Sequence, residues 1–200
     1  MSIEEQLSQR ILILDGAMGT KIQSLGLTGN NDALCLTQPD VIANIHRQYI
    51  EAGADIISTN TFSSNRISQQ EYGCADKARQ MALEGARIAR RVADEFRVES
   101  LELSDISTAE QKSLNSKHST LNRIWVAGSM GPTSKSLSLA SDMNNPALRT
   151  VDFDEMAAAY YEQAEALMEG GADLLLLETC YDALNTKAAL YAIQQLNERR

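Results

Sequence analysis

The stretch that decides the fold is Ile11-Leu-Ile-Leu-Asp-Gly-Ala-Met-Gly-Thr20. Its first four residues are apolar, and an acid, Asp15, follows them directly, with two closely spaced glycines behind it. This pattern predicts a buried strand that carries a carboxylate at its exposed C-terminal end. In parallel α/β architectures, ligands bind where the strands end and the loops begin. Asp15 is therefore the first candidate site residue.

Two later stretches repeat this arrangement and align with each other without a gap. They are Glu51-Ala-Gly-Ala-Asp-Ile-Ile-Ser-Thr-Asn60 and Glu169-Gly-Gly-Ala-Asp-Leu-Leu-Leu-Leu-Glu178. In each, a helix is expected to end at a glycine, Gly53 or Gly171, because glycine readily adopts the left-handed conformation that closes a helix. A short apolar strand follows. The two stretches are one helix-to-strand unit used twice.

Each of these two strands ends in a polar residue, Asn60 or Glu178. Taken alone, either residue is explained equally well as the cap of the following helix. Their recurrence with Asp15 at strand ends favours a shared site instead.

Composition describes one ordinary globular domain. The chain has 200 residues, of which 44% are hydrophobic and 22% charged. A net charge of -9 without a cluster of basic residues argues against a nucleic-acid surface. No apolar run approaches the roughly 20 residues that span a bilayer, and no signal-peptide pattern is present at the N-terminus. These features predict a cytoplasmic protein that binds neither nucleic acid nor membrane.

The cysteines and histidines form no recognisable metal motif. Three widely spaced cysteines suit reduced thiols that pack in the structure better than a disulfide framework. No C-x-x-C, H-E-x-x-H or adjacent pair of cysteines occurs, so the chain itself offers no zinc site. The residues concerned are Cys35, Cys74, Cys180, His46 and His118.

Helices are expected between the strands. Thr37 is predicted to cap a helix that extends to about Glu51, with His46 at the edge of its apolar face. An alanine-rich helix is expected from about Asp76 to Phe96. The last two helices are expected to begin at acidic caps, Asp152 and Asp182.

A long polar segment precedes the third strand. Residues 98–122 show almost no periodicity and are predicted to be a flexible, exposed connection within the domain. A strand over 124–127 then leads into a glycine-rich loop, Gly128-Ser-Met-Gly-Pro-Thr133. Glycines on either side of Ser129 can present backbone N–H groups to an anion, although most loops of this kind only form a turn.

Strands and helices therefore alternate four times, which predicts parallel strands joined by right-handed crossovers. An open doubly wound sheet would be complete at this length. A (β/α)8 barrel needs about 250 residues, so the chain would cover only its first four βα units. The dinucleotide fingerprint is missing from the turn after the first strand, which counts against the doubly wound alternative.

Four of these stretches together resemble the homocysteine S-methyltransferase family. They are the first strand and its turn, the strand ending at Asn60 with Thr61 and Phe62, residues 127–132, and Leu175-Leu-Leu-Glu-Thr179. The resemblance covers almost all 200 residues and is strongest to the N-terminal module of the cobalamin-dependent methionine synthases. Thr28-Gly-Asn-Asn-Asp32 resembles that branch, and the tyrosine that betaine-dependent members carry near Ser63 is absent.

The resemblance implies a (β/α)8 TIM barrel of which residues 1–200 form the N-terminal part. It implies that homocysteine lies over the C-terminal face, with its thiol on a zinc held by three cysteines. Those cysteines belong to later motifs that this sequence lacks, so zinc ligands are expected beyond residue 200, and neither a metal ligand nor a catalytic residue is assigned to this chain. The methyl donor would be methylcobalamin, regenerated from methyltetrahydrofolate, on cobalamin- and folate-binding modules of the same polypeptide.

The resemblance also assigns the substrate-binding residues. Asp15 and Glu178 match the acids that bind the substrate ammonium. Residues near the substrate carboxylate and sulfur are Gly16, Ser58, Thr59, Asn60, Gly128 and Ser129.

Two alternatives to the cobalamin-dependent enzyme remain open. One is a methyltransferase that takes its methyl group directly from betaine or S-methylmethionine. The other is a non-catalytic half-barrel fragment that associates through exposed sheet edges.

Overall fold

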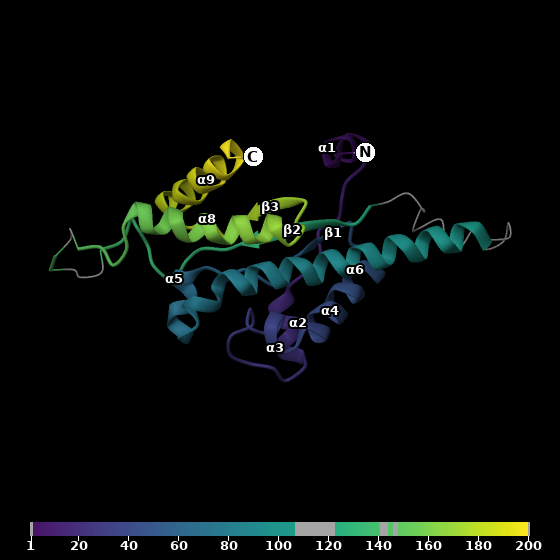
Figure 1. The fold of residues 1–200 in the computed structure, drawn as a ribbon, viewed down its shortest axis with the longest axis horizontal. Coiled ribbons are helices and arrows are strands. Elements are labelled where there is room, and N and C mark those ends of the chain that lie inside the picture. The colour runs from purple at the N-terminus through teal and green to yellow at the C-terminus, as the bar shows by residue number, and fades with distance from the viewer. Residues whose placement is uncertain (1, 107–122, 141–143, 146–147, 200) are drawn as a thin grey trace.

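The computed structural model describes residues 2–106, 123–140, 144–145 and 148–199. Helices dominate the described chain, and α6 is the longest of them (Figure 1). In chain order the elements, with η marking 3-10 helices, are α1 (Ile3–Gln9), α2 (Met18–Ser24), α3 (Leu34–Thr37), α4 (Pro39–Glu51), β1 (Ile56–Ser58), α5 (Arg66–Gln69), η1 (Gln70–Tyr72), η2 (Ala75–Lys77), α6 (Ala78–Ile106), β2 (Trp125–Met130), α8 (Phe153–Glu169), β3 (Leu174–Leu177) and α9 (Ala183–Glu198).

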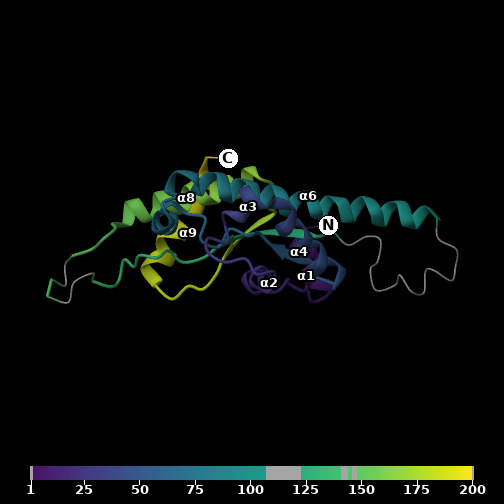
Figure 2. The same cartoon turned by 90° about the horizontal axis from the view of Figure 1, so that it is seen from below.

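The strands form a parallel sheet in the order β1-β2-β3, with Ser58 opposite Ala127 and Met130 opposite Leu177. Spatial order thus follows chain order. The helices follow the same order, since α6 packs on α4 and on α8, and α8 packs on α9 (Figures 1 and 2). A doubly wound sheet reverses its strand order at a switch point. The described strands show no such reversal, which agrees with the barrel-type winding.

The first strand is shorter and more exposed than its sequence predicts. Leu14 joins the sheet through a single parallel bridge to Ile56, and the residues before it form no strand. The prediction of a buried strand over 11–14 is therefore wrong for this structure. The segment lies at the sheet edge, and Ile11 and Ile13 are 88% and 58% exposed. Among the described residues, this segment pairs only with β1, and no described element covers its other side, so its side chains stay exposed.

Several helix ends agree with the sequence. Gly53 and Gly171 have φ values of 106° and 98°, as expected for glycines that close helices. Asp152 caps α8 in a capping box with Glu155, and Asp182 caps α9. The two glycines confirm the helix ends of the repeated helix-to-strand unit, and the two acids confirm the predicted starts of the last two helices.

Two predictions about α4 are wrong. Its N-cap is Gln38, because Thr37 ends the preceding helix α3, where its hydroxyl donates to the carbonyl of Ala33. His46 is not at the edge of the apolar face but fully buried, and neither ring nitrogen has a hydrogen-bond partner among the described residues. This burial lowers the pKa of His46 to about 4, so the ring is neutral at pH 7.

Helix α6 continues ten residues past its predicted end, from Phe96 to Ile106. This stretch contains no glycine or proline, and its glutamates and leucines favour helix. The polar composition of a segment is therefore not enough to predict where a helix ends. The predicted flexible connection over 98–122 is thus helical in its first part, and the rest of it lies outside the described residues. Among the described helices, none has the length and apolar character needed to cross a membrane.

The amino ends of the strands carry two acids with largely buried side chains, whose role the sequence did not show. Asp55, which precedes β1, receives two hydrogen bonds from Arg10, at 2.6 and 2.8 Å. It also accepts from the backbone N–H of Ile13 at 2.9 Å. The carboxylate therefore holds the start of the neighbouring first strand in register.

Asp173 does the same one repeat later. It precedes β3 and accepts from the backbone N–H of Val126, in the adjacent strand, at 2.9 Å. Arg90 donates to it at 2.9 Å, and Arg123 pairs with its other oxygen. Asp55 and Asp173 thus have the same structural role, since each hydrogen-bonds to the backbone of the preceding strand segment.

Candidate active site at the carboxyl ends of the strands

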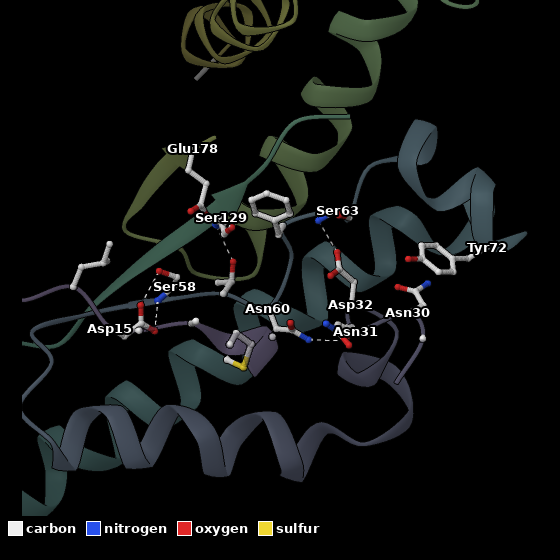
Figure 3. Close-up of a pocket in the computed structure, with 18 residues that line it drawn as sticks. Asp15, Asn30, Asn31, Asp32, Ser58, Asn60, Ser63, Tyr72, Ser129 and Glu178 are labelled. Atoms are coloured by element: carbon white, nitrogen blue, oxygen red, sulfur yellow. Dashed lines mark hydrogen bonds between the residues drawn. The ribbon is translucent and has the colours of Figure 1, made fainter. Parts of the chain in front are cut away.

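A pocket of about 470 Å³ opens at the carboxyl ends of the strands (Figure 3). All but one of the residues assigned to the site from the sequence line it, namely Asp15, Gly16, Ser58, Thr59, Asn60, Ser129 and Glu178. The exception is Gly128. The fold therefore brings together residues from three separate strand ends, as expected of a parallel sheet.

Asp15 lies beside the end of β1 and is held there by Ser58. The backbone N–H of Ser58 donates to Oδ2 of Asp15 at 2.9 Å, and its hydroxyl donates to Oδ1 at 2.8 Å. Burial raises the pKa of Asp15 to about 6, the Ser58 hydrogen bonds oppose that rise, and the negative charge of Glu178 adds to it. The charge of Glu178 therefore acts on Asp15 within the pocket.

Glu178 directly follows β3 and receives a hydrogen bond from Ser129. The distance from Ser129 Oγ to Glu178 Oε1 is 2.5 Å. The next residue, Thr179, has a φ of 57°, which a β-branched residue rarely adopts. Such strain is found where the surrounding structure needs a particular chain direction. Here it turns the chain immediately after the carboxylate.

Ser129 itself is fixed by a buried polar network. Its N–H donates to Thr59 Oγ1 at 2.9 Å, and its carbonyl accepts from Thr61 Oγ1 at 2.8 Å. Gln163, reaching in from α8, donates to the carbonyl of Thr61 at 2.8 Å. The Thr59 hydroxyl therefore binds a protein group, the N–H of Ser129, and its role in the site is to hold β1 against β2.

Asn60 joins β1 to the loop that forms another wall of the pocket. Its side-chain N–H donates to the carbonyl of Asn31 at 2.8 Å, and its own carbonyl accepts from the Cys35 thiol at 3.3 Å. It caps no helix, because the following helix α5 is capped by Asn65. Glu178 likewise does not cap α9, whose cap is Asp182. The helix-cap explanation of Asn60 and Glu178 is therefore wrong.

The two glycines assigned to the site differ in position. Gly16 lines the pocket, and a Cβ there would lie 2.9 Å from the ring of Tyr49, so no side chain fits without a shift. Gly128 is part of β2, which extends further than the predicted 124–127, rather than part of a loop. A Cβ on it would meet Leu167 and Ala172 at 3.1–3.3 Å. It therefore lies on the helix-covered face, away from the pocket.

The sequence missed a second polar wall, formed by residues 29–32. Asp32 is 5% exposed and accepts from the N–H of Ser63 and the hydroxyl of Ser64, both at 2.8 Å. Burial raises the pKa of Asp32 to about 6. Asn30 pairs with Gln69 at 2.6 Å. Figure 3 shows Asp32, Asn30 and Tyr72 on the side of the pocket opposite Asp15. The sequence feature that could have indicated this wall is Gly29 followed by two asparagines, Asn30 and Asn31.

The pocket is strongly acidic. Three carboxylates line it, from Asp15, Asp32 and Glu178, and no lysine, arginine or histidine does so in the described part of the chain. None of the three forms an ion pair with a described basic residue. Carboxylates without a counter-charge attract cations, so the pocket favours a ligand with a positively charged group.

The described residues do not fit a metal centre. No group of three or more histidine, cysteine, aspartate or glutamate side chains among them is arranged to hold an ion. Cys35 is buried under Asn60, and burial raises the pKa of its thiol to about 12, which disfavours the thiolate that a metal binds. Cys74 donates to the carbonyl of Tyr72 at 3.3 Å, and Cys180 is exposed.

Fold and pocket together define a parallel α/β protein with an acidic pocket at the carboxyl ends of its strands. Residues 12–199 match the sequence family described as homocysteine S-methyltransferase. The chain belongs to that family, which confirms the resemblance seen in its sequence.

Solved structures of one family member share the fold. The oxidised form of the homocysteine methyltransferase MmuM from Escherichia coli superposes with a TM-score of 0.68 at 20% identity, covering 96% of this chain and 61% of MmuM. The metallated form gives 0.69 at 19% identity, covering 98% and 63%. At such identities the likeness concerns the fold alone. The chain spans about three fifths of the length of these structures.

Proposed function

We propose that the chain forms the homocysteine-binding part of a homocysteine S-methyltransferase, with the ammonium group of homocysteine held between Asp15 and Glu178. The observation that carries the proposal is a pair of carboxylates in one pocket, Asp15 directly after the Leu14 bridge and Glu178 directly after β3, with no described basic residue lining that pocket. An ammonium supplies the missing charge and donates charge-assisted hydrogen bonds to both acids. Family membership supports homocysteine as the amine that binds there.

The size of the pocket supports a second ligand beside homocysteine. The eight non-hydrogen atoms of homocysteine occupy at most about 240 Å³, if each takes the ~30 Å³ of a liquid water molecule. The pocket volume of about 470 Å³ leaves space for the reacting group of a methyl donor. The wall at residues 29–32 borders that space, opposite Asp15.

The described residues account for substrate binding rather than activation of sulfur. A thiol with a pKa near 8.5 is only a few per cent thiolate at pH 7, so methyl transfer needs a group that stabilises the anion. Zinc performs this role in the proposal, but the described side chains offer no ligand set for it. We therefore expect less than one zinc per molecule in the 200-residue chain, measured by elemental analysis.

For the methyl donor we propose methylcobalamin, regenerated from methyltetrahydrofolate, on further modules of a methionine synthase. Support comes from residues 28–32, which resemble the cobalamin-dependent branch and of which residues 29–32 form a wall of the pocket. A donor such as betaine or S-methylmethionine is the alternative. Cobalamin- and folate-binding modules in the parent gene would favour the first, and their absence the second.

We also propose that residues 1–200 supply the first four βα units of a (β/α)8 barrel. The strand order and the exposed Ile11 and Ile13 at one sheet edge support this arrangement. A non-catalytic half barrel that pairs through such edges is the alternative. A light-scattering mass of twice the chain mass, without turnover, would favour that alternative.

The test of the proposed site is calorimetric titration of homocysteine into the protein and its Glu178→Gln and Asp15→Asn variants. Each amide keeps the shape and removes the charge, and each should cost about 1.5–3 kcal/mol of binding free energy. Asp152→Asn is the matched control, because asparagine also caps helices and α8 begins away from the pocket. Binding by Glu178→Gln as tight as by the parent protein would refute the assignment.

A further inference from the structure

Ser58 was assigned to the substrate, but its polar groups contact Asp15 instead. Its N–H and its hydroxyl donate to different oxygens of the Asp15 carboxylate, at 2.9 and 2.8 Å. Side chains alternate along a strand, and the preceding Ile57 is fully buried, so Ser58 points to the other face, where the pocket lies. Figure 3 shows both hydrogen bonds at the edge of the pocket.

Apart from Ser58 and a smaller effect of its own backbone N–H, the surroundings of Asp15 disfavour its charge. Glu178, after β3, faces it with a like charge, and burial removes water. Tyr49, from α4, lies beside it, but its hydroxyl donates to the carbonyl of Ala17. Lys21 of α2 lies 5.8 Å from the centre of the Tyr49 ring and donates to Gln48, and it forms no ion pair with Asp15. Ser58 is thus the residue that provides Asp15 with hydrogen-bond donors.

We propose that Ser58 is a positioning residue, whose two donors keep the Asp15 carboxylate ionised and aimed into the pocket to receive the ammonium group of the substrate. The identity of that substrate rests on the proposed function, whereas the action of Ser58 on Asp15 does not. Ser58 has no direct contact with the substrate in this assignment.

The magnitudes predict that Ser58 matters most below neutral pH, where Asp15 is only partly ionised. With its pKa at about 6, Asp15 is about 90% ionised at pH 7. A hydrogen bond to a carboxylate lowers its pKa by roughly half a unit to one unit. Removing the hydroxyl would therefore raise the pKa of Asp15 toward 7, where about half of the molecules are protonated and cannot pair with an ammonium group.

The experiment compares Ser58→Ala with Ser58→Thr, which restores a hydroxyl. Ser64→Ala is the matched control, because it removes an equivalent hydroxyl-to-carboxylate bond of 2.8 Å from Asp32 and does not line the pocket. The first measurement is a carboxyl carbon NMR titration of Asp15 without ligand. The second is calorimetric titration of L-homocysteine at pH 5.5 and at pH 8.

In Ser58→Ala the midpoint of Asp15 should rise by about half a unit to one unit. Homocysteine should then bind about threefold to eightfold more weakly at pH 5.5, where the ionised fraction falls, and within about twofold of the parent at pH 8. Ser58→Thr should restore both values, and Ser64→Ala should leave both unchanged.

Two results would overturn the proposal, namely an unchanged Asp15 midpoint in Ser58→Ala, or equal weakening of binding at both pH values. The second would show that Ser58 only supports the structure. If the parent protein binds no homocysteine, the proposed function fails, but the NMR titration still decides whether Ser58 controls Asp15.

Discussion

The two ends of the parallel strands carry acids in opposite electrostatic settings. At the amino ends, Asp55 and Asp173 pair with arginines and with the backbone of the neighbouring strand. At the carboxyl ends, Asp15 and Glu178 accept hydrogen bonds from serines, and neither forms an ion pair with a described base. An acid neutralised inside the protein supports the fold, whereas one left without a counter-charge is available to bind a cation.

The sharpest test of this contrast is Asp173→Asn. The Asp173 side chain is 9% exposed, and its loss of charge leaves Arg90 and Arg123 without their shared partner. Because the Asp173 carboxylate is largely buried while its arginine partners are partly exposed, this loss should lower the free energy of unfolding by about 3 kcal/mol, the low end for a buried pair. Denaturant unfolding measures this loss of stability. Asp76→Asn, at an exposed position, is the control and should change stability by less than about 0.5 kcal/mol. Equal effects of the two variants would contradict a structural role for Asp173.

The second test concerns Asp32, a buried acid in the pocket wall. Its pKa is raised to about 6 by burial, so the folded state binds its proton more tightly than the unfolded state. The stabilisation from this proton is fully present below about pH 4 and is lost as the pH rises through 6.

Asp32→Asn removes this titration and can still accept both hydrogen bonds, since both go to one oxygen of Asp32. Its stability relative to the parent protein should therefore improve by about 2–3 kcal/mol between pH 4 and pH 8. Unfolding experiments at the two pH values measure this difference. A constant difference would show that Asp32 is ionised throughout the range.

The smallest effect is expected at Thr179, next to Glu178. Its side chain is exposed and its φ is 57°, a conformation that asparagine adopts more readily than threonine. Thr179→Asn should raise the free energy of unfolding by about 0.5–1 kcal/mol without changing homocysteine affinity. Thermal unfolding measures the change in stability, and calorimetric titration measures the homocysteine affinity. A loss of stability would mean that neighbouring contacts, and not strain, set this φ.

Much of the site was predictable because its signals are local. A carboxylate or amide directly after a short apolar run identifies a strand end, and parallel strands place such ends together. Asp15, Asn60 and Glu178 were found in this way. Gly128 was misplaced because β2 extends past the glycine, so the face on which it lies follows from the length of the strand.

Other features depend on residues that are far apart in the chain. Asp55 and Asp173 occupy equivalent places in the repeat, but their arginine partners are brought to them only by folding. The wall containing Asp32 likewise depends on Ser63 and Ser64, thirty or so residues later. No local pattern distinguishes an acid that will meet an arginine from one that will not.

The sequence by itself determined the alternation of helices and strands, the glycines that end helices, and the acids at strand ends, because backbone conformation and side-chain period are local properties. Only the tertiary structure decided which acids are neutralised, that Ser58 serves Asp15 and Ser129 serves Glu178, and that His46 is buried. Those outcomes depend on distances between elements, and on the water and charge that packing removes or brings near, which no single segment of the chain specifies.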